Sequence, residues 1–212
     1  MITQKQLLIL LLFMNSFVIC LSAQEELPKA GHYSIVPGQS RIEVKAGTSG
    51  MLGFMGHGHT IAPKIFSGEM EFAPKEKIPA KVSVRVDASS LQETAEFKPE
   101  DKTQIETQLH GEVLETKKYP EISFQSTNVT YTVSPGHAFD VNIEGDLALH
   151  GVTRKINVPV RIIDDGTNLR ATGKFEIKRQ DYKVETKSAG GGTVKVSKTL
   201  EVNFDLLLKP QQ

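Results

Sequence analysis

The sequence predicts an all-β fold, a single eight-stranded antiparallel β-barrel with one capping helix. Three observations support this prediction. Apolar and polar residues alternate with a period of two through most of the chain after residue 40. The longest alternating runs reach about ten residues or more, whereas an ordinary strand has five or six. Only one segment has helical periodicity. A β-sandwich would also alternate, but long strands curl most naturally into a closed barrel, which leaves no exposed sheet edges.

In the first half of the chain, short runs of residues place their apolar side chains on one face. These runs cover residues 42–46, 66–72, 82–86, 122–124 and 129–133. The last two runs follow Tyr119-Pro120 and have opposite parity. Because a change of parity within one strand requires an extra residue, we expect a β-bulge near Ser126 to Asn128.

The second half of the chain alternates even more regularly. Its runs cover residues 139–149, 156–162, 169–177 and 194–208. Asp164-Asp165-Gly166 lies between the second and third of these runs and is typical of a turn. No internal repeat or linker interrupts the pattern, so we expect one domain over residues 31–209.

One helix is expected over about residues 99–116. Pro99 suits a first helical turn, and the two acidic residues after it lie beside the positive helix end. A narrow apolar stripe at positions i, i+4 and i+8 is formed by Ile105, Leu109 and Val113. This stripe needs a surface to cover, which would make the helix a cap on the barrel.

The N-terminal residues have the pattern of a secretory signal. Lys5 is followed by an apolar run and by Ala23, a small residue at the expected cleavage point, so we expect a signal peptide over residues 1–23 and a short leader over 24–30. A signal anchor and a lipoprotein anchor at Cys20 are the alternatives. Cleavage would place the protein in the periplasm or outside the cell, and would remove the single cysteine of the chain.

Charge and motifs argue against several functions. Without Lys5 the mature chain has 24 basic residues (25 minus one) against 25 acidic ones, a balance that does not favour nucleic acid. The sequence has no nucleophile elbow, no zinc-protease motif, and no phosphate-binding or dinucleotide-binding glycine loop. We therefore expect a protein that is not an enzyme. Homodimerisation through a barrel flank is compatible with the sequence.

Five phrases in a fixed order resemble the YceI-like family of polyisoprenoid-binding periplasmic proteins. They lie at residues 33–42, 66–72, 118–127, 145–154 and 178–182, and include Tyr119-Pro120-Glu121-Ile122 and His150-Gly151-Val152-Thr153. The resemblance implies an elongated, lipocalin-like barrel that is closed at one end and holds an isoprenoid or another lipid tail. It implies no cofactor. Residues 53–60 depart from the better-known members, which leaves the ligand of this branch open.

The inner face of such a barrel would contact the ligand. The residues expected to do so are Phe54, Phe66, Met70, Phe72, Val82, Val84, Phe124, Phe139, Val141, Leu147, Phe175 and Phe204. Three glycines on the same face, Gly68, Gly145 and Gly173, are expected to leave volume unfilled. Arg154 and Arg179 are candidates for contact with a headgroup. The pattern alone is also compatible with a filled barrel that has a structural or surface-interaction role.

The histidines raise an alternative function, a metal- or haem-binding stress protein. His57 and His59 would point to the same face of an extended strand. His110 lies on the expected helix, and His150 precedes a turn. If the helix caps the barrel mouth, these four side chains could meet and bind a transition metal or haem.

Overall fold

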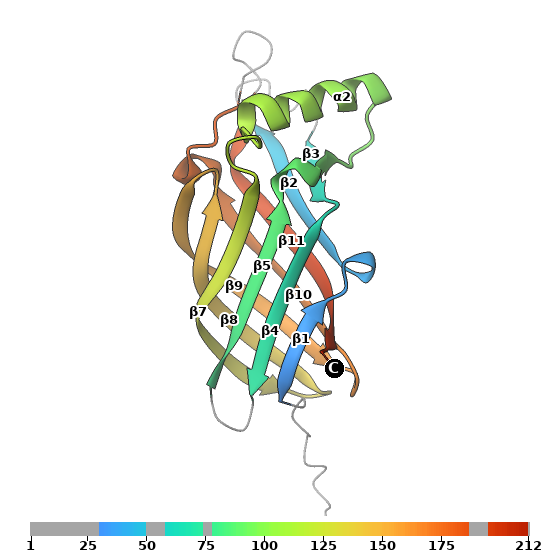
Figure 1. Ribbon diagram of the computed structural model, residues 1–212, viewed down its shortest axis with the longest axis vertical. Helices are drawn as coiled ribbons and strands as arrows, with labels where there is room; N and C mark the ends of the chain where they lie inside the picture. Colours follow the sequence, from blue (N-terminus) through green and yellow to red (C-terminus); the bar gives the residue numbers. More distant parts are fainter. Residues whose placement is uncertain (1–29, 50–57, 74–77, 187–194, 212) are drawn as a thin grey trace, which may run out of the picture.

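A computed structural model describes residues 30–49, 58–73, 78–186 and 195–211. Within these residues, one antiparallel sheet contains every strand segment and closes on itself, because β1 pairs with both β4 and β11 (Figure 1). The segments are β1 (Gly31–Ile35), β2 (Arg41–Ser49), β3 (His59–Pro63), β4 (Phe66–Ala73), β5 (Ile78–Asp87), β6 (Leu91–Glu93), β7 (Glu121–Ser134), β8 (Ala138–Leu149), β9 (Val152–Asp164), β10 (Leu169–Lys178) and β11 (Lys195–Pro210).

These segments make eight strands, because each of the first three strands is interrupted once. β1 and β2 both pair with β11 and are separated by a short 3-10 turn, Pro37–Gln39. β3 and β4 pair with β2 and β1 respectively, and so form the second strand. β6 and β5 pair with β3 and β4 and form the third. The predicted eight-stranded antiparallel barrel is therefore confirmed.

The second and third strands break side by side, at residues 64–65 and Ala88–Ser90. The backbone N–H of Lys64 donates to the carbonyl oxygen of Ser90 over 3.1 Å. The N–H of Ile65 donates to the Ser90 hydroxyl oxygen over 3.0 Å. This side chain thus satisfies a backbone donor where the strand ladder is broken, and keeps the wall continuous.

Two local predictions are confirmed. The register of β7 against β8 shifts between Ser126 and Asn128, as the change in parity required. The Asp164–Gly166 segment forms the turn between β9 and β10. There the Asp165 carboxylate accepts from the backbone N–H groups of Thr167 and Asn168, and Gly166 has φ +86°. Since that φ disfavours side chains, the glycine suits the turn.

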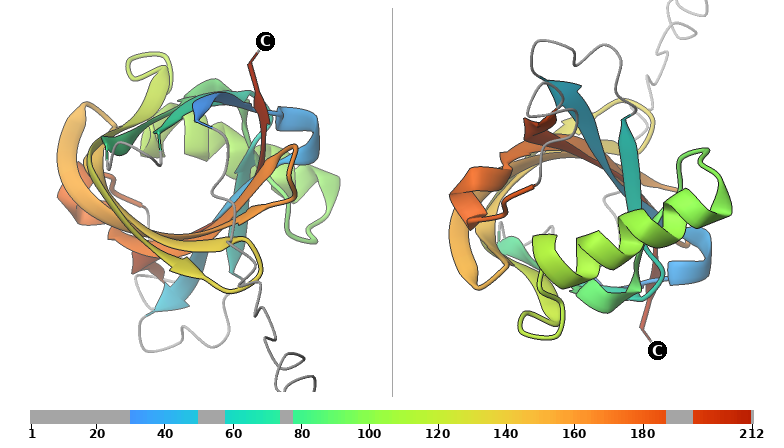
Figure 2. Two further views of the ribbon diagram at one scale, coloured as in Figure 1. Left: turned by 90° about the horizontal axis from the view of Figure 1, so that it is seen from below. Right: turned by 90° about the horizontal axis from the view of Figure 1, so that it is seen from above.

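The helix lies across one end of the barrel, over one side of its mouth (Figure 2). α2 (Pro99–Gln108) has its proline at the first turn, with Glu100 and Asp101 following. It continues into a single turn of π-helix, η5 (Leu109–Val113). The predicted capping helix is present, but its last part widens into this turn. Among the described residues, no helix is long and apolar enough to cross a bilayer.

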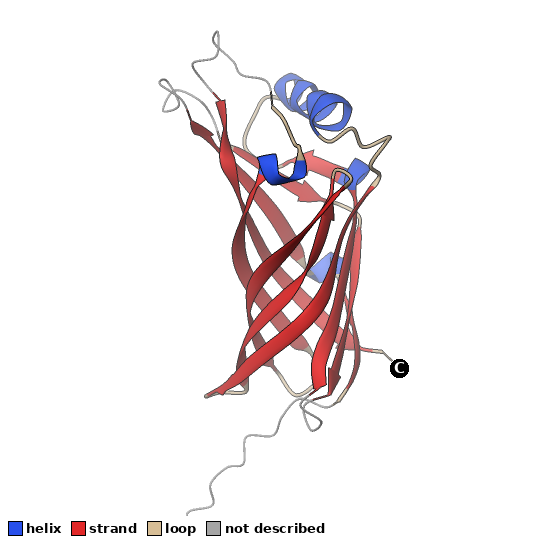
Figure 3. Cartoon of the chain, turned by 90° about the vertical axis from the view of Figure 1, so that its left-hand side faces the viewer, coloured by secondary structure: helices blue, strands red, loops and turns tan. Residues whose placement is uncertain are grey.

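The two ends of the barrel differ in how they are filled. The strands run between α2 at the upper end and the β7–β8 and β9–β10 turns at the lower end (Figures 1 and 3). At the lower end the rings of Phe72, Tyr131 and Phe139 meet edge to face or tilted, with centroids 6.2–6.3 Å apart. Leu169 beside them is 1% exposed. We call these four residues the floor.

Candidate functional site: the barrel lumen

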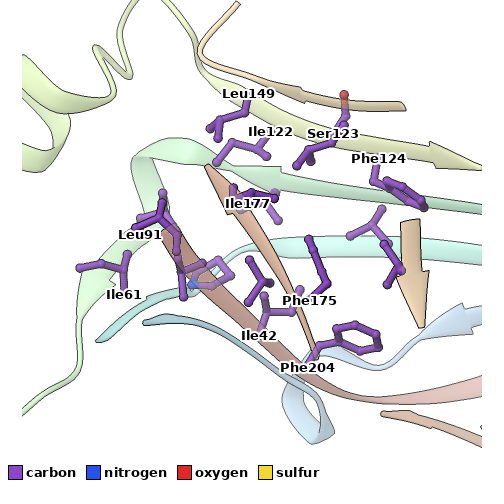
Figure 4. Close-up of a pocket in the computed structure, with 18 of the residues that line it drawn as sticks. Ile42, Ile61, Leu91, Ile122, Ser123, Phe124, Leu149, Phe175, Ile177 and Phe204 are labelled. Carbon is purple, nitrogen blue, oxygen red and sulfur yellow. The ribbon is translucent and has the colours of Figure 1, made fainter. Parts of the chain in front are cut away.

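A cavity of about 720 Å³ occupies the lumen above the floor. Its wall is almost entirely apolar and comes from the inward side chains of the strands. Figure 4 shows part of this wall, with Ile42, Phe175, Ile177 and Phe204 on one side and Ile122 and Phe124 on another. The volume lies within the range of small-molecule sites, about 300–1,000 Å³. The barrel is therefore hollow, and the alternative of a filled barrel is wrong.

Seven of the twelve residues predicted to contact a ligand line this cavity: Met70, Val82, Val84, Phe124, Leu147, Phe175 and Phe204. Four do not: Phe66, Phe72, Phe139 and Val141. These four belong to the buried core, where neighbouring side chains cover them, so inward orientation alone did not give access to the lumen. Phe54 lies outside the described residues.

The upper part of the cavity comes from segments that the alternation did not assign to the lumen. Ile61 on β3 and Leu91 on β6 line it beyond the strand breaks (Figure 4). The apolar stripe of the helical segment, Ile105, Leu109 and Val113, lines it as well. In the sequence this stripe is an apolar face without a partner. In the structure it faces the cavity inside the barrel.

The three inner-face glycines do not leave empty space, contrary to the prediction. A Cβ atom built on Gly145 would collide with the ring of Phe124, and one on Gly173 would collide with the ring of Phe204. A Cβ on Gly68 would collide with Ile35. Each glycine instead lets a large neighbour lie against the wall. The rings are thereby held beside the strands, and the centre of the lumen stays open.

At the mouth, the imidazole ring of His59 contacts the carboxylate of Glu93. The Nδ1 atom of His59 lies 2.8 Å from Oε2 of Glu93, whose side chain is fully buried. The other carboxylate oxygen, Oε1, accepts from the backbone N–H groups of Thr60 and Ala95 over 3.0 and 2.9 Å. The His59 ring also stacks on Phe97. These contacts fasten β3 to β6 and satisfy the buried carboxylate.

His150 belongs to a different group of contacts, at the β8–β9 turn. Its Nε2 atom lies 2.9 Å from Oε2 of Glu115, and its Nδ1 atom lies 3.2 Å from the carbonyl oxygen of Tyr182. Tyr119 packs edge-on against the ring, with a centroid distance of 4.5 Å. His150 therefore ties the turn to the segments that follow α2 and β10.

The four histidines named as a metal site are not brought together in the described part of the chain. His59 and His150 have the separate carboxylate partners given above, and the Nδ1 atom of His110 is buried and has no hydrogen-bond partner among the described residues. No group of three His, Cys, Asp or Glu residues there could hold a metal ion. His57 lies outside the described residues.

Of the two arginines considered for a headgroup, one lines the cavity. Arg179 begins the short 3-10 turn η6 (Arg179–Tyr182), and its side chain is buried. Its Nε–H donates to the carbonyl oxygen of Ser197 over 3.1 Å, and an Nη1–H donates to that of Val184 over 2.9 Å. Arg154 on β9 is exposed, does not line the cavity, and donates to the carbonyl oxygen of Asp181.

Tyr182 completes an apolar cluster beside Arg179. The cluster contains Leu147, Leu149, Ile177 and Val184, and Tyr182 is 1% exposed. Burial is the main cause that raises the pKa of its phenol, and the charge of Asp181 adds to it. The hydroxyl is therefore neutral at physiological pH, and it has no hydrogen-bond partner among the described residues.

Comparison with known proteins agrees with this architecture. The YceI-like domain matches residues 33–208. The chain is 33% identical to a UPF0312 protein of Vibrio campbellii over 106 residues, 49% of either chain. It is 28% identical to Protein YceI of Escherichia coli over 134 residues, 58% of this chain and 62% of that one. The chain thus spans about half to three fifths of the length of these relatives.

Solved structures share the fold at low sequence identity. BcnA of Burkholderia cenocepacia superposes with a TM-score of 0.63 at 20% identity, over 82% of this chain and 98% of that one. A polyisoprenoid binding domain from Saccharophagus degradans, implicated in plant cell wall breakdown, gives 0.60 at 18% identity, over 86% and 100%. The matched domain covers nearly the whole barrel, and the chain belongs to the YceI-like family.

Proposed function

We propose that the protein binds one long apolar molecule inside the barrel, for transport, storage or sequestration. A polyisoprenoid, an isoprenoid quinone or a fatty-acid derivative has the required shape. The observation that carries this proposal is the cavity of about 720 Å³ with an apolar wall and a floor of packed rings. An elongated space of this kind matches a chain-like hydrocarbon better than a compact polar metabolite.

Hydrophobic transfer supplies enough free energy for such binding. Each methylene group moved from water to an apolar wall contributes about 0.8 kcal/mol. Ten groups would contribute about 8 kcal/mol, from which several kcal/mol are lost when the ligand is immobilised. Useful affinity therefore does not require polar anchors along the tail. No chemical step is needed for this role.

We propose further that the protein acts after export. The signal-like residues 1–23 support this location, although they lie outside the described residues. An exported barrel with an apolar lumen could carry a lipid through an aqueous compartment, where the free lipid would aggregate. Cell fractionation would show whether the mature chain is released into the periplasm or the medium, and the N-terminal residue of the purified protein would show whether cleavage follows Ala23.

A lumen-filling substitution tests the binding site. Ala171 on β10 lines the cavity, whereas its neighbour Thr172 is exposed on the outer face. We expect Ala171→Trp to lower the affinity for a fluorescent fatty acid at least about a hundredfold, because the indole takes the space of the tail. Thr172→Trp is the matched control and should bind as the wild type does. Equal binding by both folded variants would contradict a site in the lumen.

A further inference from the structure

We infer that Arg179 forms a subsite for an anionic headgroup at the upper end of the lumen. The inferred ligand class is a long-chain amphiphile with an acidic group, a carboxylate or a phosphate. This inference rests on the proposed function, because it orients the apolar ligand that the lumen is proposed to hold. The guanidinium group would bind the acid, and the tail would extend toward the floor.

The position of Arg179 is the first observation. It follows β10 directly, and Ile177, two residues earlier, also lines the cavity. η6 lies at the end of the barrel that carries α2, since the carbonyl oxygen of Tyr182 contacts His150 in the β8–β9 turn (Figure 1). The opposite end is filled by the floor. When an amphiphile enters tail first from the open end, its headgroup is therefore buried last and comes to lie near Arg179.

The second observation is that the charge of Arg179 is buried and has no counter-ion among the described residues. Among the described residues only two charged side chains are buried, Glu93 and Arg179. The Glu93 carboxylate has hydrogen-bond partners in His59 and in the backbone N–H groups of Thr60 and Ala95. No described carboxylate forms an ion pair with Arg179, whose two hydrogen bonds go to uncharged carbonyl groups. A buried charge without a counter-ion is costly, so an acid delivered by the ligand would gain an unusually strong interaction.

The geometry of the side chain is the third observation. The bonds to Val184 and Ser197 use two of the five N–H donors of the guanidinium group. They fix its plane between the η6 segment and β11, so little rotamer freedom is lost when an acid binds. Arginine is also less strongly hydrated than lysine and offers two parallel donors to a carboxylate or phosphate.

Most other basic side chains on the barrel wall do not have these properties. Arg161, Arg170 and Lys174 are exposed, and each is paired with a carboxylate on the outer face. They account for surface charge balance and lie away from the lumen. Arg179 is the described basic residue that combines burial with access to the cavity.

Matched ligands can test this inference on delipidated full-length mature protein. The probes are palmitate, hexadecyl phosphate and the neutral hexadecanol, each displacing a neutral fluorescent dye from the lumen. We expect the wild type to bind at least one of the two acids roughly ten- to a hundredfold more tightly than the alcohol, the range for a hydrogen bond to a charged group. Whichever acid binds more tightly identifies the headgroup class.

The substitution Arg179→Gln should abolish that preference and leave hexadecanol affinity within about twofold of the wild-type value. Arg154→Gln changes an exposed arginine that does not line the cavity, so it is the control and should keep the preference. A purely structural arginine would change all three affinities together, which would overturn the inference. Equal affinities in the wild type would also overturn it, and this result needs no variant to fold. Failure of every probe to bind would instead count against the proposed function.

Discussion

The lower and upper parts of the barrel are built from the same alternating strands, yet one is packed solid and the other is hollow. At the floor, the rings of Phe72, Tyr131 and Phe139 pack against one another. Higher up, Phe124 and Phe204 lie over glycines and are held beside the wall. For these two rings, a glycine on the neighbouring strand leaves the space that lets them border the cavity instead of filling it.

The strand breaks add to this contrast. β7 to β11 run as single segments, whereas each of the first three strands is interrupted below the mouth. Beyond the breaks, β6 pairs with β3, which also pairs with β2; the His59–Glu93 contact joins β3 to β6, and Ile61 and Leu91 line the cavity there. The contacts at the upper end therefore hold the short strands around the opening of the cavity. Those at the lower end fill the barrel with packed rings.

A pair of alanine substitutions gives the largest expected difference between the two parts. Phe139→Ala removes a ring that is 2% exposed from the floor, and should lower the free energy of unfolding by about 3–5 kcal/mol. Phe175→Ala removes a half-buried ring that borders the empty lumen, and should cost about 1–2 kcal/mol. Urea unfolding of the delipidated proteins measures both values. Equal losses would mean that the lumen is as tightly packed as the floor.

A smaller effect is expected where a ring rests on a glycine. In Gly173→Ala the new methyl group would displace the Phe204 ring toward the lumen, at a cost of about 1–3 kcal/mol in unfolding free energy. Binding of a fluorescent fatty acid should weaken as well, since the ring enters the space of the tail. The double variant Gly173→Ala, Phe204→Leu should recover most of the loss in binding but only part of the loss in stability, because the new methyl group also meets the backbone carbonyl oxygen of Pro159. If it recovers neither, the glycine has another role.

Much of the wall could be predicted from the sequence. A period of two fixes which side chains point inward, and the change in parity near Ser126 located the β-bulge. The helical stripe of Ile105, Leu109 and Val113 correctly indicated a surface in need of cover. These features are local, because they depend on residues within a few positions of one another in the chain.

The extent of the cavity could not be predicted, because it depends on contacts between distant strands. Phe139 and Phe175 have the same inward parity, and only the closed barrel shows that one is packed and the other borders the lumen. The pairing of His59 with Glu93, 34 residues away, follows from the β3–β6 ladder that no local pattern indicated. The prediction for the inner-face glycines is wrong for the same reason, since their neighbours across the sheet do not follow from the local pattern.

Native mass spectrometry of the protein, purified without detergent from its own cells, would show whether the lumen holds a lipid. We expect one tightly held molecule of several hundred daltons per chain, extractable into organic solvent and absent from Ala171→Trp. A chain that carries no such mass, and takes up none when offered polyisoprenoids and fatty acids, would contradict a lipid-holding lumen.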